Sequence, residues 1–257
     1  MDRVTTDNDD NDDRPCCWIC LESGPHAESG SPLRRNCSCR CLSGYAHTDC
    51  LSRYARRQSS IAGTADLAAF GRPWEVCPNC SQPYRNEVVI DLSSAFIDFV
   101  DEGKHNNDMT RLAARRLRLV AFGTYLMSTS RSGAPSKSLD DAKEASRAVI
   151  AMIDEMRAEE GMRLPQPVQI LETDAYSVLG MAHLQQETGG GAAEAVLYFT
   201  KCRDMCEKIG HRLGMTVAES NIALSLAKSG QSRVVDTREN LSKYDTMYQV
   251  RRREKEM

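Results

Sequence analysis

The chain has 257 residues, of which 41% are hydrophobic and 27% are charged, and this balance suits one or two globular domains with a hydrophobic core. Its net charge of -3 gives no general attraction to nucleic acid or to an anionic membrane. The sequence contains no run of about 18 apolar residues, which argues against a membrane-spanning helix.

The N-terminal segment, residues 1–14, is acidic, with six aspartates and almost no large apolar side chains. A segment of this composition cannot bury enough apolar surface to compensate for the entropy lost on ordering, so we expect a disordered tail. The segment also lacks the apolar stretch of a secretory signal peptide. We therefore expect an intracellular protein, in the cytoplasm rather than the nucleus.

Residues 15–92 contain nine of the eleven cysteines but few large aliphatic side chains. Inside the cell these thiols would be reduced, so their clustering indicates metal binding rather than disulfides. Zinc is the expected ion, because thiolate and imidazole groups suit it and four protein ligands close its coordination shell. Eight ligands make two structural sites, which would stabilise a region that is poor in apolar residues. The candidate pairs are Cys17 and Cys20, Cys37 and Cys39, His47 and Cys50, and Cys77 and Cys80.

Some assignments in this region stay open from the residues alone. Cys37, Cys39 and Cys41 alternate along the chain, and any two of them could form the second pair. Iron–sulfur clusters are the alternative to zinc, but they are usually held by four thiolates, and His47 fits a pair of zinc sites better. His26 stands in a loop rich in Gly, Pro and Ser, where we expect it to face solvent.

From residue 93 to residue 257 apolar residues recur every three or four positions, which predicts an all-α region. Four arginines of its second expected helix, Arg111, Arg115, Arg116 and Arg118, are interpreted as a solvated basic face rather than a phosphate site. Cys202 and Cys206 are expected to pack in the interior rather than to bind a metal. The expected helices cover residues 92–102, 107–128, 138–159, 169–186, 192–209 and 214–229.

Two neighbouring helices of this region resemble in part the helix pair of a tetratricopeptide unit. Histidine replaces an aromatic residue of that pattern, and no proline closes the second helix. A generic antiparallel bundle accounts for the pattern as well, because any close helix pair needs small residues at the contact. Either arrangement would serve as a binding scaffold. The matching residues are Tyr176, Leu179, Gly180, His183, Ala195, Phe199 and Cys202.

The cysteine-rich region reads CWICLE from Cys17, CSC from Cys37, then seven residues, HTDCL from His47 and CPNC from Cys77, with Tyr84 beyond. This pattern resembles the RING-CH (RING-variant) zinc finger. The resemblance implies a small α/β domain that two zinc ions brace crosswise, followed here by the all-α region. In that family the first and third pairs share one zinc, and the second and fourth pairs share the other. The resemblance therefore implies that the first zinc is bound by Cys17, Cys20, His47 and Cys50, and the second by Cys37, Cys39, Cys77 and Cys80.

A PHD finger, a reader of histone tails, has the same order of ligands and is the alternative family. It has two residues inside its second pair and about four or five before the histidine, whereas this chain has one and seven. Pairing Cys39 with Cys41 would shorten the second gap to five residues, but no choice among the three cysteines leaves two residues between them. The spacing therefore favours RING-CH and leaves Cys41 free.

The RING-CH resemblance implies a ubiquitin-protein ligase that docks a ubiquitin-conjugating enzyme charged with ubiquitin. Its effect on rate comes from orienting two bound partners, so no catalytic residue is expected in this chain. By correspondence with the family, the docking surface would include Ile19, Trp74 and Pro78. The helical region would then bind a protein substrate or partner, whose identity the sequence does not give.

One departure from the family pattern favours a competing hypothesis. Many RING fingers carry Arg or Lys directly after the last zinc ligand to hold ubiquitin, and this chain has Ser81 there. A non-enzymatic zinc-binding interaction module is therefore the alternative to a ligase, and a PHD-like reader is a third hypothesis.

Overall fold

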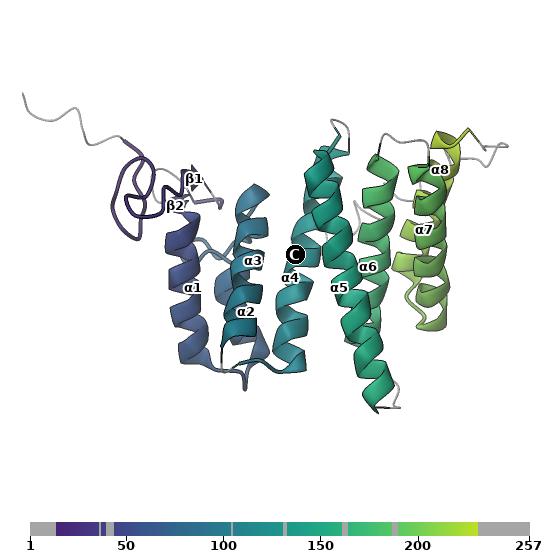
Figure 1. Ribbon diagram of the computed structural model, residues 1–257, viewed down its shortest axis with the longest axis horizontal. Coiled ribbons are helices and arrows are strands. Elements are labelled where there is room, and N and C mark those ends of the chain that lie inside the picture. The colour runs from purple at the N-terminus through teal and green to yellow at the C-terminus, as the bar shows by residue number, and fades with distance from the viewer. Residues whose placement is uncertain are drawn as a thin grey trace, which may run out of the picture. The chain divides into compact units, whose positions relative to one another are not determined.

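The computed structural model describes residues 14–35, 37–39, 44–103, 105–130, 133–160, 164–186 and 190–230. These residues form two short strands followed by eight helices (Figure 1), which confirms the predicted α/β domain followed by an all-α region. The chain divides into two compact units, Met1–Leu117 and Arg118–Met257. Apart from Arg14, the predicted acidic tail lies outside the described residues, as does Cys41.

The first unit starts with a loop that leads into two antiparallel strands, β1 (Leu33–Arg35) and β2 (Tyr45–His47). Strand β2 runs directly into helix α1 (Thr48–Ala62), so that His47 is both the last residue of the strand and the N-cap residue of the helix. Its side chain makes no capping hydrogen bond to the helix. The imidazole is therefore available for another role at the strand–helix junction.

Aromatic side chains of helices α2 (Leu67–Glu75) and α3 (Asn86–Glu102) form the hydrophobic core of the first unit. The indole of Trp74 stacks on Phe96 with ring centroids 4.9 Å apart, and its Nε1 donates a 2.8 Å hydrogen bond to Ser59 Oγ of α1. Phe70 also packs against Phe96. This cluster ties the three helices together beneath the cysteine-rich loops.

Helix α3 begins at Asn86, six residues before the expected start at residue 92. Its buried stripe consists of Val88, Leu92, Phe96 and Val100, which are four residues apart and so lie on one face. The core that they enter continues to Leu117 of helix α4 (Asp108–Thr129). Apolar mass from α3 and α4 thus supports the cysteine-rich region.

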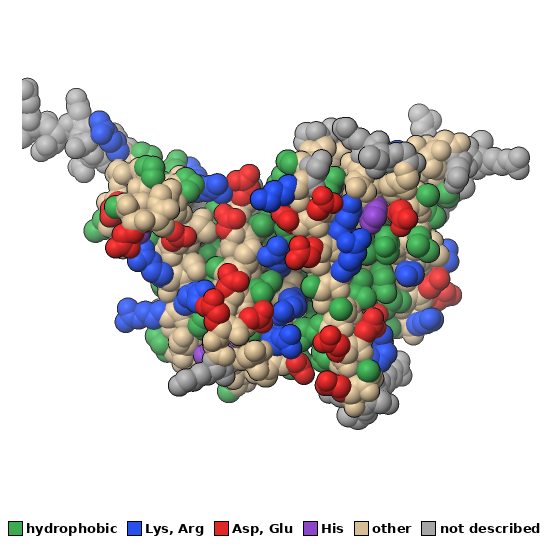
Figure 2. Space-filling view, in the orientation of Figure 1, with side chains coloured by type: hydrophobic (Ala, Val, Ile, Leu, Met, Phe, Trp, Pro, Cys, Tyr) green, Lys and Arg blue, Asp and Glu red, His purple; other side chains and the backbone are tan. Residues whose placement is uncertain are grey.

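Three arginines of α4, Arg111, Arg115 and Arg116, form ion pairs within the first unit. Arg115 lies 3.2 Å from Asp101, and Arg116 lies 3.6 Å from Glu75. Arg111 approaches both Asp101 and Asp108, at 3.9 and 3.6 Å. Basic and acidic side chains are also interspersed over the face shown in Figure 2. This pairing argues against a phosphate site on α4 and makes the basic face less solvated than expected.

The second unit packs four successive helices, α5 (Ser136–Glu160), α6 (Gln166–Gln185), α7 (Gly191–Lys208) and α8 (Arg212–Lys228), each against the next (Figure 1). Their bounds agree with the expected helices to within three residues. Cys202 and Cys206 are buried beside Ala218, as predicted, and neither belongs to a candidate metal-binding group of the described residues. None of the described helices is long and apolar enough to cross a membrane.

Gly180 of α6 lies in close contact with Phe199 of α7. A Cβ atom added at Gly180 would lie 2.7 Å from the ring of Phe199, which is fully buried. The small residue that the sequence places at this contact is therefore required by the packing. A tetratricopeptide unit and a generic bundle both have such a contact, so the repeat stays a prediction.

We expect Gly180→Ala to destabilise the second unit. The added methyl group overpacks the core at a typical cost of about 1–3 kcal/mol, which exceeds the gain of up to about 1 kcal/mol in helix propensity. Chemical denaturation followed by circular dichroism measures the change. Gly190→Ala is the control, because a Cβ atom there meets nothing within 4 Å. Equal stability of the two variants would contradict the packing argument.

Candidate metal centre

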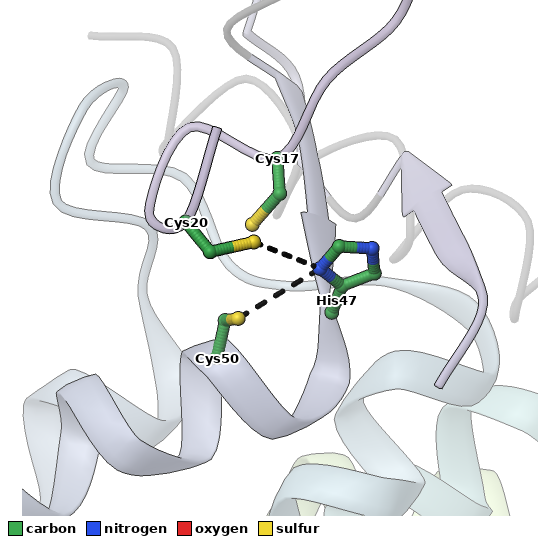
Figure 3. A group of neighbouring side chains, drawn as sticks. All are labelled: Cys17, Cys20, His47 and Cys50. Carbon is green, nitrogen blue, oxygen red and sulfur yellow. Dashed lines mark hydrogen bonds between the residues drawn. The ribbon is translucent and has the colours of Figure 1, made fainter. Parts of the chain in front are cut away.

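Three separate segments converge on the first cluster of ligand-type side chains (Figure 3). Cys17 and Cys20 come from the N-terminal loop, His47 from the end of β2, and Cys50 from the first turn of α1. Their sulfur and nitrogen atoms all lie within 4.8 Å of one another. The side chains of Cys17 and His47 are fully buried, and that of Cys50 is nearly so.

The distances in this cluster match the edges of a zinc tetrahedron. With Zn–S bonds of about 2.3 Å and Zn–N bonds of about 2.0 Å, two sulfurs lie about 3.8 Å apart and a sulfur and a nitrogen about 3.5 Å apart. His47 Nδ1 is 3.4 Å from Cys20 Sγ and 3.7 Å from Cys50 Sγ, as the dashed lines in Figure 3 mark. The donor atoms thus fit one tetrahedral ion.

The tautomer of His47 follows from its other ring nitrogen. Nε2 lies 2.8 Å from the carbonyl oxygen of Gly24, and a carbonyl can only accept a hydrogen bond. Nε2 therefore carries the proton, and the lone pair of Nδ1 is directed at the sulfurs. A carbonyl partner on the second ring nitrogen is the usual device that orients a metal-binding histidine.

The second cluster joins residues that are even farther apart in the sequence. Cys37 and Cys39 follow β1, while Cys77 and Cys80 lie in the loop between α2 and α3. Cys39 Sγ and Cys77 Sγ are 3.7 Å apart, again close to the sulfur–sulfur edge of a zinc tetrahedron. All four sulfurs lie within 4.8 Å of one another.

The loops that carry the first and fourth cysteine pairs have the same backbone conformation. The N–H of Cys17 donates a hydrogen bond to Glu22 O, and the carbonyl of Cys17 accepts one from Leu21 N. In the same way, the N–H of Cys77 donates to Gln82 O and the carbonyl of Cys77 accepts from Ser81 N. The residue after the second cysteine has a positive φ in both loops, 65° for Leu21 and 55° for Ser81. Two equivalent turns therefore present their cysteines in the same way.

The thiols of each cluster differ in how readily they ionise. Burial raises the pKa of Cys39 and raises that of Cys50 to about 12. Burial also opposes ionisation of Cys17, but backbone hydrogen bonds, chiefly at Cys20, lower its pKa to about 7. A hydrogen bond from the backbone of Gln82 lowers the pKa of Cys80 to about 7. A bound dication would supply the charge that stabilises the remaining thiolates.

Residues 17–65 match the family model of the RING-variant domain. The chain contains a RING-variant domain. The match covers the first three ligand pairs and ends before Cys77 and Cys80, which the structure brings to Cys37 and Cys39. No curated protein and no solved structure matches the chain.

The structure places the three residues predicted for partner binding in different environments. Pro78 is exposed on the loop of the fourth cysteine pair, and Ile19 is partly buried on the loop of the first. Trp74 is fully buried between α1 and α3, so its prediction as part of a contact surface is wrong. A tryptophan ahead of a zinc loop does not reveal by itself whether it faces the core or solvent.

The RING-variant domain also has structural features that the sequence pattern did not reveal. His26 is 5% exposed, so the prediction that it faces solvent is wrong. Leu21, beside the first cysteine pair, is 75% exposed in spite of its apolar side chain. Neither His26 nor Leu21 belongs to a helical or strand periodicity in the sequence. Only the fold of the loop determines that His26 is buried and Leu21 is exposed.

Metal analysis tests the two clusters. We expect two zinc ions per chain, and Cys37→Ser should reduce the number to one because the second cluster loses a ligand. Cys16→Ser and Cys41→Ser should keep both ions. Atomic emission on the purified full chain counts them. Loss of an ion from Cys41→Ser together with retention in Cys37→Ser would shift the ligand register by two residues.

Proposed function

We propose that the chain is a RING-CH-type ubiquitin-protein ligase that binds two structural zinc ions and docks a ubiquitin-conjugating enzyme. The observation that carries the proposal is the RING-variant match together with two four-residue clusters paired crosswise along the chain. Zinc in such closed shells supplies stability to the loops and no chemistry to the reaction. The four residues of each cluster would hold one zinc ion.

The proposed contribution to ubiquitin transfer is orientation. Ile19 and Pro78 lie on the two equivalent cysteine loops, so the metal clusters would fix both contact residues on one rigid domain. A conjugating enzyme held there would present its ubiquitin to a substrate lysine in a restricted geometry, which lowers the entropic part of the barrier. The reduced state that the thiolate ligands need supports a cytoplasmic setting.

The second unit is proposed to select the protein substrate or partner. Leu197 on α7 is 50% exposed and Leu224 on α8 is 47% exposed, and both are candidate contact residues. Lys201 lies over the rings of Tyr176 and Tyr198, at 5.6 and 5.9 Å from their centroids. Tyrosine and exposed apolar side chains are typical of protein-binding surfaces.

A non-enzymatic zinc-binding interaction module is the second candidate function, and Ser81 is the observation that favours it. This residue follows the last cysteine and adopts φ 55°. Its short, uncharged side chain stands where many RING fingers have a cation. The domain could then dock a partner without promoting ubiquitin transfer. A PHD-like reader is less well supported, because residues 17–65 match the RING-variant domain.

An autoubiquitination assay separates ligase from module. The full chain should stimulate at least one conjugating enzyme in a broad panel, and Ile19→Ala should reduce that rate at least tenfold, since apolar anchors dominate such contacts. Ile61→Ala, at an isoleucine that is 71% exposed on the last turn of α1, is the matched control.

Both variants should retain two zinc ions, which shows that Ile19→Ala acts at the contact and not on the fold. A chain that neither binds nor stimulates any enzyme of the panel would exclude the ligase proposal. Binding to a histone-tail peptide that tolerates Ile19→Ala would instead support the PHD-like hypothesis.

Ser81→Arg tests whether the missing cation limits the rate. We expect the substitution to raise ubiquitin discharge from the conjugating enzyme several-fold, while binding of the uncharged enzyme stays unchanged. The left-handed backbone at Ser81 costs an arginine about 1 kcal/mol, comparable to the cost that Leu21 already bears in the equivalent turn. Single-turnover discharge to free lysine measures the effect, and an unchanged rate would show that Ser81 does not limit transfer.

A further inference from the structure

His26 is buried next to the first metal cluster without belonging to the eight expected ligands. It lies in the loop between Cys20 and β1, and its backbone is fixed by hydrogen bonds from His26 N to Ser31 O and from Gly30 N to His26 O, both 2.8 Å long. The same loop supplies Gly24 O, the acceptor for His47 Nε2. The loop therefore folds over the metal-ligand histidine and holds a second imidazole there.

Arg53 and Ser29 hold the ring of His26 from its two sides. A guanidinium Nη2 of Arg53 lies 2.7 Å from His26 Nε2, and a guanidinium can only donate hydrogen bonds. Nε2 therefore accepts, and Nδ1 on the other side of the ring lies 3.4 Å from Ser29 N and 3.3 Å from Ser29 Oγ. Both ring nitrogens are thus engaged by residues of the loop and of α1.

This pair touches two members of the first cluster. The ring of His26 packs edge to face on the ring of His47, with centroids 5.2 Å apart and an interplanar angle of 78°. The Nη2 atom of Arg53 that binds His26 is also 4.0 Å from Cys50 Sγ. Arg53 stands three residues after Cys50 on α1, so the helix itself presents the guanidinium to the sulfur.

A role for His26 as a metal ligand is the competing interpretation. Ligand-type atoms of Cys20, Glu22 and His26 all lie within 4.8 Å of one another. However, the lone pair of His26 Nε2 already accepts from Arg53, and that guanidinium would repel a cation bound beside it. The arrangement fits a residue that supports the site from outside the coordination shell.

We propose that His26 and Arg53 are positioning residues of the first metal site, which hold His47 and Cys50 in place and slow the release of the ion. This inference rests on the proposed zinc binding and extends it to a region that contributes no ligand. Residues that orient metal ligands typically change metal affinity by about 10- to 100-fold when they are removed.

The test measures metal retention by the full chain, independently of any ligase activity. Zinc-loaded protein is mixed with a chromophoric chelator, and release of the two ions is followed over time. His26→Ala and Arg53→Ala should each accelerate release of one ion by about 10- to 100-fold and leave the other unchanged. Arg57→Ala, at an exposed arginine on the same helix, is the matched control and should release both ions as the unmodified chain does.

Cobalt substitution identifies which site is affected. The first cluster offers three sulfurs and one nitrogen and the second offers four sulfurs, so their cobalt absorption spectra differ. The variants should weaken the spectrum of the three-sulfur site. The double variant should release the ion about as fast as the faster single variant, because loss of either residue breaks the hydrogen bond that holds the other.

His26→Gln keeps an acceptor for Arg53 and should therefore retain the ion nearly as well as the unmodified chain. If His26→Ala fails to fold, His26→Gln is used in its place. Unchanged release in both alanine variants would overturn the proposal. A zinc count of one in folded His26→Gln would identify His26 as a ligand and would overturn it as well. An unmodified chain that holds no zinc would refute the proposed function instead.

Discussion

The structure of the first unit depends on one constraint, which is that a short segment must serve two metal clusters at once. Cys37 and Cys39 at its start belong to the second cluster, whereas His47 and Cys50 at its end belong to the first. Strand β2, which pairs with β1, ends at His47. Neither cluster can assemble fully until this segment is in place, so the two sites and the small sheet are expected to form together.

The two clusters and the aromatic core stabilise different parts of the same unit. The loops around the cysteines contain little apolar mass, and a metal ion would compensate for that lack. Helices α1, α2 and α3 instead bury Trp74, Phe70 and Phe96 in close contact. Ser59 and Trp74 join these helices through a buried hydrogen bond beneath the loops. The unit is thus a conventional small core, next to loops that a metal ion would stabilise.

Much of the candidate site could be predicted from the sequence because ligand chemistry and spacing are local properties. The four pairs and the helices of the second unit needed only residue types and short intervals, whereas the crosswise sharing of the pairs was implied by the resemblance to the RING-CH zinc finger. Exposure could not be predicted in this way. Trp74 and His26 were placed wrongly because their environment is set by Phe96, Ser59 and Arg53, which lie 15 to 27 residues away in the sequence.

The position of His47 at the N-cap of α1 has a mechanical consequence. A ligand at the N-cap of a helix fixes not only where the helix starts but also its rotation about its own axis. Leu51, Ala55 and Ser59 follow at four-residue intervals and are all buried. The metal site would therefore act as an angular reference, and its occupation would decide which side of α1 meets the core.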